Sequence, residues 1–489
     1  MKETHLVGID LGTKKLALAV GTREEGRIKI LYYNEFPSDG ISHSKILNTA
    51  KLSKALRSAV DMAGNCLGVK ITAAKVGCQK YEIHQSDSCG NVTLGGDQYV
   101  TREVLDNLEQ NAWEEIGKNL DEGDEILGTV AQGFSTDDEI CICQDDVMGM
   151  ISSQVGANYK IYTGRKSAKR NIEAAFAECA IADARMEFDP LTPGAVLLSE
   201  NERRGGVALV DFGAGATSVS IFSGGTLRHY AGIPFGGRNI TLDIQNVCGI
   251  SETLAENIKL QYGGCLPNEL GSMGEKTIRI TDKDSGKKTE ITVKDLSETI
   301  TARVREILDA VLWEIQQSGF ADSLRCGIVV TGGCAPMLNL CPMIKKISGY
   351  SARIAAPSVN MFDADMTFFT PGASAVAALL LKLSETSPTD CTTEKEEEKK
   401  TVETPHQEPA AQEESEGGAK ENEPAEKEEE GEEEPWFGNL FSLGKKKPKA
   451  EKKPKQPSKP KEPKQENEGT RLFEGLFGDD ENNNEDDMV

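Results

Sequence analysis

The 489-residue sequence is poor in long apolar segments. The longest apolar run near the end of the predicted folded part, residues 375–381, is far shorter than the roughly 20 residues that a helix needs to cross a bilayer. The first five residues lead directly into a predicted strand and do not resemble a secretory signal. We therefore expect a cytoplasmic protein.

Closely paired cysteines and positive charge are also scarce. The twelve cysteines are scattered and include no Cys-x-x-Cys pair, so we expect structural residues with free thiols. The net charge of −24 argues against nucleic acid, whose phosphates attract a basic surface. Much of this charge lies in a tail, because residues 385–434 contain 20 acidic and 5 basic residues.

Residues 207–222 contain a possible anion-binding pattern. An apolar run ends at Asp211, a turn with Gly213 and Gly215 follows, and Thr217 begins an alternating strand. Glycines allow a tight turn whose N–H groups converge on an anion, and a carboxylate beside a phosphate is suited to a hydrated Mg²⁺. This stretch by itself could also be an ordinary glycine-rich hairpin.

The same pattern occurs near the N-terminus. Residues 6–20 again give a strand, Asp10, a turn at Gly12, the hydroxyl residue Thr13 and a second strand. Two copies indicate an internal duplication. Two facing hairpins could hold one polyphosphate and its metal from opposite sides, whereas the alternative is two unrelated hairpins.

The order of the surrounding elements favours an α/β fold. Strands are expected over residues 28–34 and 69–77, with a helix over 46–63 between them. Together with the first hairpin, these strands predict a mixed sheet. From about residue 81, short polar strands (81–84, 91–94) and a helix over 101–116 predict a compact insert.

Farther on, helices are expected over 190–202 and 295–319. The strand 326–331 ends in Gly332 and Gly333, which permit close backbone approach to a flat ligand. Small residues in the last folded helix, from Pro371 to about Leu383, would allow tight packing between domains.

These motifs, in this order, resemble the actin/heat-shock chaperone/sugar-kinase ATPase superfamily. Within it, the segments 227–237, 256–265 and 327–333 are similar to the FtsA family of bacterial cell-division proteins, and the insert falls where that family has its own subdomain. The resemblance covers about residues 5–383. It implies an actin-like duplicated ATPase fold with two lobes around a nucleotide cleft, an FtsA-type inserted subdomain and a disordered C-terminal tail.

The resemblance also implies a division of the chain into subdomains. The expected parts are 1–81, 159–204 and 359–384 (subdomain 1A), 82–158 (inserted subdomain 1C), 205–247 and 323–358 (subdomain 2A), 248–322 (subdomain 2B), 385–434 (acidic disordered linker), 435–447 (amphipathic membrane-targeting segment) and 448–489 (disordered tail).

Carried over residue by residue, the resemblance implies a site for ATP and Mg²⁺. Asp10 and Asp211 would hold the metal through water. The phosphates would be contacted by Gly12, Thr13, Lys14 and Lys15 from one side and by Gly213, Gly215 and Thr217 from the other. The ribose and adenine would be contacted by Glu256 and Lys259, and Gly332, Gly333 and Met337 would line the adenosine pocket. Without the resemblance, Glu256 and Lys259 would be interpreted as a surface ion pair one helical turn apart.

No residue is assigned to catalysis. Hydrolysis needs a group that positions water in line with the γ-phosphate. In actin and the chaperones an amide or carboxylate before the second hairpin has this role, but the corresponding spacing falls near Gly194, where Thr192, Pro193 and Ala195 supply neither. We therefore expect ATP binding with at most slow ATPase activity.

The tail contains two short amphipathic motifs. On a helix the apolar residues of the first share a face, and a polybasic run follows, which is the composition of an interfacial anchor for anionic lipid. Its residues are Trp436, Phe437, Leu440, Phe441, Leu443, Lys445, Lys446 and Lys447. The second motif, residues 471–478, lies among acidic residues, so a protein partner or added avidity is expected there. Both could also be inert apolar spots.

The function implied by the resemblance is a scaffold for cell division. Such a protein would polymerise on the inner face of the cytoplasmic membrane at the septum, bind the C-terminal peptide of FtsZ through subdomain 2B and recruit later divisome proteins through subdomain 1C. The alternatives are a pilus-assembly protein similar to PilM and a small-molecule kinase of the same superfamily.

Overall fold

The computed structural model describes residues 4–77, 80–141, 143–281, 286, 288–386 and 390–394. The two tail motifs, with all eight predicted membrane-binding residues, lie outside these residues. Within the described residues, no helix is both long and apolar enough to cross a membrane, and ten of the cysteines there form no disulfide bond.

The first sheet contains the N-terminal hairpin. Strands β1 (Leu6–Leu11) and β2 (Lys15–Glu24) are antiparallel, and β7 (Ala73–Gly77) lies parallel to β1 on its other side. The remaining strands of this sheet are β3 (Arg27–Pro37), β12 (Asp183–Glu187) and β20 (Phe362–Asp363). Both faces are covered, so β1 and β2 are apolar almost throughout.

Two layers of helices cover the first sheet. Helices α1 (Thr49–Leu67) and α4 (Lys166–Ala177) bury one face of it, and α11 (Ser374–Glu385) buries the other. Gly8 of β1 allows this helix to approach closely, because a Cβ there would lie 3.3 Å from side-chain atoms of Val376 and Leu379. Ala377 and Ala378 of the same helix are buried in one cluster with Leu6 of β1 and Ala17 of β2.

The second sheet repeats the arrangement of the first. Strands β13 (Val207–Phe212) and β14 (Thr217–Ser223) form an antiparallel hairpin, and β18 (Ile328–Thr331) lies parallel to β13. The outer strands are β15 (Thr226–Ile233) and β19 (Ala352–Ile354). In each hairpin the aspartate, Asp10 or Asp211, is the last residue but one of the first strand and precedes a glycine-containing turn.

Helices and a hairpin complete this half of the chain. They are α7 (Gly237–Cys248), α8 (Glu252–Tyr262), α9 (Val293–Gln317), α10 (Leu340–Ser348), and the hairpin of β16 (Thr277–Thr281) and β17 (Lys288–Thr292). One face of α9, with Ile300, Val304, Ile307 and Val311, is buried as its periodicity predicts. The helix begins two residues before the predicted position, where the Thr292 side chain accepts a hydrogen bond from the Asp295 N–H.

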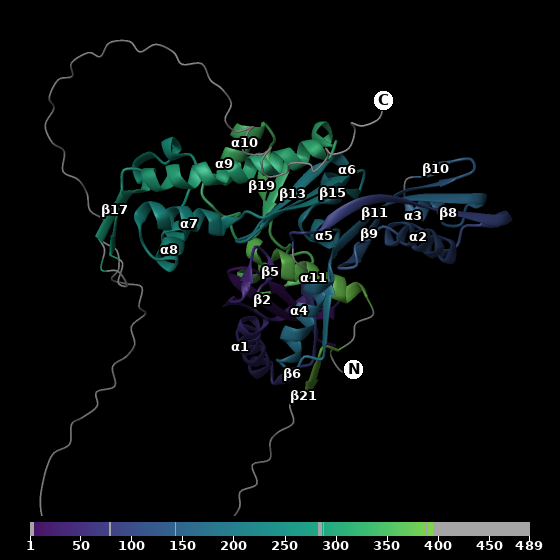
Figure 1. Cartoon of the computed structure of the whole chain (residues 1–489), viewed down its shortest axis with the longest axis horizontal. Helices are drawn as coiled ribbons and strands as arrows, with labels where there is room; N and C mark the ends of the chain where they lie inside the picture. Colours follow the sequence, from purple (N-terminus) through teal and green to yellow (C-terminus); the bar gives the residue numbers. More distant parts are fainter. Residues whose placement is uncertain are drawn as a thin grey trace, which may run out of the picture. The chain divides into compact units, whose positions relative to one another are not determined.

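The insert is a four-stranded sheet covered by one helix. Strands β8 (His84–Tyr99), β11 (Ile151–Arg165) and β9 (Asp124–Thr136) lie side by side with the short β10 (Ile140–Cys141), and α2 (Arg102–Gly117) packs against β8 and β11 (Figure 1). The strand expected at 91–94 is part of the longer β8, whereas the strand expected at 81–84 is wrong, because β8 begins only at His84. β11 pairs with β8 and β9 to residue 163 or beyond, so the boundary expected at 158 falls inside a single strand.

Two other expectations about local structure are wrong. The helix expected over 190–202 is divided into α5 (Thr192–Leu197) and α6 (Glu200–Gly205), because Ser199 forms a capping box with Glu202 that starts a new helix. The strand expected over 69–77 is also divided, into β6 (Val69–Ile71) and β7.

The linker was expected to be disordered from residue 385, and this too needs correction. Strand β21 (Thr392–Glu394) pairs with β6 (Figure 1), and Cys391 is buried against the first sheet. The Cys391 carbonyl oxygen accepts hydrogen bonds from the N–H groups of Thr72 and Ala73, and its own N–H donates to the His5 carbonyl oxygen. Residues 390–394 thus satisfy backbone groups at an otherwise open sheet edge.

The remaining elements are short. They are β4 (Ile41–Ser42), β5 (Lys45–Ile46), α3 (Gln144–Val147) and the 3₁₀ turns Pro267–Glu269, Gly271–Met273, Ala321–Ser323, Met366–Phe368 and Pro371–Ala373.

Candidate functional site

A cleft of about 550 Å³ lies between the two hairpins. It is bounded by the turns after β1 and β13, by one face of α8, by the glycine pair after β18 and by the residues just before α11. Twelve of the predicted site residues line it: Asp10, Gly12, Thr13, Lys14, Lys15, Asp211, Gly213, Glu256, Lys259, Gly332, Gly333 and Met337. The structure thus brings together residues that are up to 327 positions apart in the sequence.

Two predicted phosphate ligands do not line the cleft. Thr217 is completely buried, and its hydroxyl donates a hydrogen bond of 2.8 Å to the Phe235 carbonyl oxygen. Gly215 instead lies against Thr13 of the opposite hairpin, since a Cβ on Gly215 would be 2.1 Å from Thr13 Oγ1. The tips of the two hairpins therefore touch, and only a glycine fits at that contact.

The two predicted metal-binding carboxylates share a third residue, Lys80. Its Nζ lies 2.5 Å from Asp211 Oδ2, and Asp10, Lys80 and Asp211 all line the cleft. The second oxygen of Asp211, Oδ1, is buried and has no hydrogen-bond partner among the described residues. Gly332, with a φ of +89°, makes room for it, because a Cβ there would be 2.4 Å from Oδ1.

The charges at this point shift one another's protonation. Burial raises the pKa of Asp10 above its ordinary value, and Lys80 lowers it by less. Burial by itself lowers the pKa of Lys80, but the carboxylates of Asp211 and Asp10 together outweigh burial and raise it. Lys80 is therefore an ammonium ion in a site that also contains an unpaired carboxylate oxygen.

This donor set fits a divalent cation. Mg²⁺ prefers oxygen ligands and commonly uses one or two carboxylates with water and substrate phosphates. Asp10 and Asp211 supply two carboxylates, and the unpartnered Oδ1 of Asp211 is a free acceptor. No group of three or more His, Cys, Asp or Glu that could hold a metal occurs in the described part of the chain.

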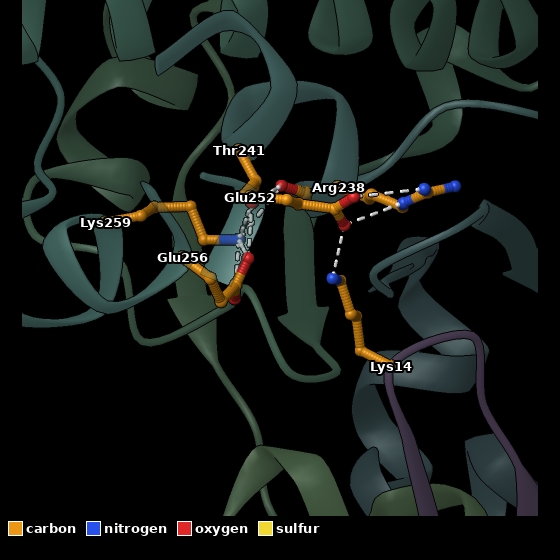
Figure 2. Close-up of polar contacts among 7 residues, drawn as sticks. Lys14, Arg238, Thr241, Glu252, Glu256 and Lys259 are labelled. Atoms are coloured by element: carbon orange, nitrogen blue, oxygen red, sulfur yellow. Dashed lines mark hydrogen bonds and ion pairs between the residues drawn. The ribbon is translucent and has the colours of Figure 1, made fainter. Parts of the chain in front are cut away.

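One face of α8 carries a second polar network, shown in Figure 2. Lys259 Nζ donates hydrogen bonds of 2.9 Å to the Gly237 carbonyl oxygen, to Thr241 Oγ1 and to the Glu256 carboxylate. A lysine ammonium has three donors, so all of them are engaged within the protein. Glu256 keeps part of its surface toward the cleft, since 23% of its side chain is exposed.

Glu252, one turn before Glu256, connects the two halves of the cleft. Its carboxylate accepts hydrogen bonds from Arg238 at 3.1 and 3.3 Å and also pairs with Lys14 of the first hairpin (Figure 2). The hydrogen bonds from Arg238 and then Lys14 lower the pKa of Glu252 to about 2. Lys14 thus reaches across the cleft mouth to a carboxylate on α8, while Lys15 pairs with Glu35 of β3.

The region where a water-positioning group was sought contains only engaged carboxylates. Thr192 and Pro193 line a smaller cavity of about 110 Å³ that also borders Asp10, Lys80 and Asp211. Asp189 accepts hydrogen bonds from the Leu191 and Thr192 N–H groups, from the Thr192 hydroxyl and from Lys382. Glu187 pairs with Lys75 at 3.0 Å.

Sequence reasoning missed Lys80, Glu252 and Arg238. A signal for Lys80 was present, because it follows the strand that was predicted over 69–77. In sheets of this type ligands gather at the carboxyl ends of parallel strands. Because β7 is parallel to β1, Gly77 ends beside Asp10, and a basic residue three positions later falls in the site. Glu252 shares the helical spacing of Glu256 and Lys259 (i, i+4, i+7), which indicated one common face.

Comparison with known proteins agrees with this geometry. The family model described as cell division protein FtsA matches residues 208–378, which include the second hairpin, α8 and the glycine pair. The chain is 29% identical over 360 residues to cell division protein FtsA of Neisseria meningitidis, covering 73% of this chain and 84% of the relative. To FtsA of Bacillus subtilis it is 27% identical over 354 residues, covering 72% and 78%.

A solved structure extends the likeness to the fold. The chain is similar to a structure titled "PilM-PilN type IV pilus biogenesis complex", with a TM-score of 0.56, 12% sequence identity, and coverage of 77% of this chain and 98% of that one. At this identity the likeness concerns the fold alone. The expected fold class is confirmed: the described chain has an actin-like ATPase fold, with duplicated sheets on either side of the cleft.

Proposed function

The chain is a relative of the cell division protein FtsA, and on that premise we propose that it is an ATP-binding scaffold of bacterial cell division. The observation that carries the proposal is the cleft. Both hairpins, the polar face of α8 and the glycine pair after β18 converge on one space of about 550 Å³, large enough for a nucleotide.

In this proposal ATP lies with its phosphates between the two hairpin turns. Gly12, Thr13 and Lys14 contact them from one side and Gly213 from the other, and Mg²⁺ is held by Asp10 and Asp211 through water. Glu256, held in place by Lys259, accepts a hydrogen bond from the ribose, and Gly332, Gly333 and Met337 border the adenosine.

ATP acts in this proposal chiefly as a signal for assembly. Of the carboxylates that border the cavity beside α5, Asp189 is bound to Lys382 and to the Leu191 and Thr192 N–H groups, and Glu187 is bound to Lys75. We therefore propose ATP hydrolysis that is slow at most. Steady-state turnover with a small-molecule phosphate acceptor, far above the background ATPase rate, would contradict the scaffold and favour a kinase.

The scaffold is proposed to polymerise at the septum on the cytoplasmic face of the inner membrane. Residues 435–447, outside the described residues, are proposed to attach it through their aromatic and polybasic composition. Deletion of 435–447 should abolish pelleting with vesicles that contain anionic lipid, while ATP binding persists. A matched deletion of 471–478 should leave pelleting largely intact, and unchanged pelleting after the first deletion would refute this assignment.

We propose that subdomain 2B (residues 248–322) binds FtsZ and that the insert binds later divisome proteins. The test is a pull-down on an immobilised C-terminal peptide of FtsZ, with a scrambled peptide of the same composition as the control. We expect retention on the native peptide alone. Equal retention on both peptides, or on neither, would contradict the proposed function.

A further inference from the structure

We propose that Lys80 is an internal counter-ion of the phosphate site, which holds the Asp10–Asp211 carboxylate pair when no divalent cation is bound and so reduces the dependence of nucleotide binding on that cation. This inference rests on the proposed ATP-binding function. It assigns a task to a residue that neither hairpin contains.

The position of the ammonium group supports this assignment. Lys80 Nζ lies 2.5 Å from Asp211 Oδ2, and Lys80, Asp10 and Asp211 border both the cleft and the smaller cavity of about 110 Å³ beside it. Only 25% of the lysine side chain and 19% of the Asp211 side chain are exposed. Two carboxylates at such a site repel one another and also repel a phosphate, unless a cation is present.

The backbone of Lys80 is fixed from both halves of the chain. Its N–H donates to Ser44 Oγ at 3.1 Å, and its carbonyl oxygen accepts a hydrogen bond of 3.1 Å from the Tyr230 hydroxyl. Gly232 of β15 packs directly against it, because a Cβ there would be 2.0 Å from the Lys80 carbonyl oxygen. The lysine stem therefore starts from a defined point and delivers its charge between the two hairpins.

A divalent cation held by Asp10 and Asp211 would compete with the Lys80 ammonium for the negative charge of this carboxylate pair. Lys80 would then be less strongly bound to Asp211 and could contribute its positive charge to the phosphates. When no cation is present, Lys80 remains on Asp211 and the site is less negative than two free carboxylates. The structure therefore predicts that this chain binds ATP appreciably in the absence of Mg²⁺.

The experiment compares ATP binding in Mg²⁺ and in EDTA for the full chain and for Lys80→Met, measured by calorimetry. Lys80→Met should weaken binding in EDTA much more than in Mg²⁺, so that the ratio of the two dissociation constants rises roughly tenfold or more, within the usual range of coupling between two ligands. Lys45→Met is the matched control. Lys45 is also a part-buried lysine in an ion pair, with Glu82, but it does not line the cleft.

Each outcome separates this inference from the proposed function. If the full chain binds no ATP in Mg²⁺, the proposed function fails. If it binds ATP and Lys80→Met leaves the ratio unchanged, or Lys45→Met raises it equally, the Lys80 inference is overturned and the function stands. Lys80→Gln keeps a hydrogen-bond donor for Asp211 without the charge, and it should show the same rise if Lys80→Met is poorly folded.

Without nucleotide, the melting temperature gives a second readout. Mg²⁺ alone should raise the melting temperature of Lys80→Met and Lys80→Gln more than that of the full chain, because it replaces the missing charge beside Asp10 and Asp211. An equal rise in all three proteins would contradict the inference.

Discussion

Replacing Lys259 by methionine should destabilise the protein strongly, because the network on α8 depends on this one ammonium. Lys259 is 7% exposed, and its three donors hold the Gly237 carbonyl oxygen, Thr241 Oγ1 and Glu256. Methionine fills a similar volume but donates no hydrogen bond. The variant therefore leaves a carboxylate without its counter-ion and a buried carbonyl oxygen with one partner fewer.

The magnitude follows from the burial of the partners. Removing one member of a fully buried ion pair costs about 3–5 kcal/mol. Glu256 retains 23% exposure and a contact with Thr241, so it can recover part of its solvation, and we expect a loss of about 2–3 kcal/mol.

Urea unfolding at pH 7 measures this loss as a change in midpoint at constant slope. The double variant Lys259→Met/Glu256→Gln should recover part of the stability, because the uncompensated charge is removed. Lys346→Met, which breaks an exposed pair with Glu269, is the surface control and should cost less than about 1 kcal/mol. A loss below about 1 kcal/mol for Lys259→Met would refute the reasoning.

Two further predictions concern the cleft mouth and the last strand. The pKa of Glu252 is lowered to about 2 in the folded protein, so its stabilising effect is complete above its unfolded pKa of 4.5 and is lost as the pH falls from about 4.5 through 2. Glu252→Gln should therefore lower the free energy of unfolding by about 1–2 kcal/mol at pH 7, after discounting for partial exposure. Urea unfolding should show that this loss becomes smaller as the pH is lowered below 4.5. A loss that does not change with pH would count against the bridge to Lys14 and Arg238. A chain ending at residue 386 should lose hydrogen-exchange protection at the Thr72 and Ala73 amides, which a chain ending at 394 keeps; equal protection would show that β21 does not pair with β6.

The hairpins and the cleft could be predicted because their signals are local. An apolar strand, an aspartate and a glycine turn within a few residues specify Asp10 and Asp211 at strand ends, and the second copy of the pattern indicates the facing half. The glycine pair after β18 could be predicted for the same reason. These features depend on backbone geometry within a few residues, so the local sequence is enough to predict them.

Other features depend on contacts between distant segments. The position of Lys80 depends on the parallel pairing of β7 with β1. The strand at residues 392–394 depends on its pairing with β6, which is more than 300 residues earlier in the sequence. The hydroxyl of Thr217 could as well have faced the cleft, but the Phe235 carbonyl oxygen takes its hydrogen bond. The length of β11 depends on its pairing with β8 and β9, which continues past the boundary expected at 158.

The central claim is that one nucleotide binds between the two hairpin turns. Calorimetric titration of the full chain with ATP in Mg²⁺ tests it most directly, when it is repeated on Gly215→Val and on the control Gly117→Val. A side chain at Gly215 would collide with Thr13, whereas a Cβ at Gly117 meets nothing within 4 Å. The account predicts one ATP per chain for the full chain and for Gly117→Val, and loss of binding for Gly215→Val. Absence of ATP binding to the full chain, or undiminished binding to a folded Gly215→Val variant, would contradict it.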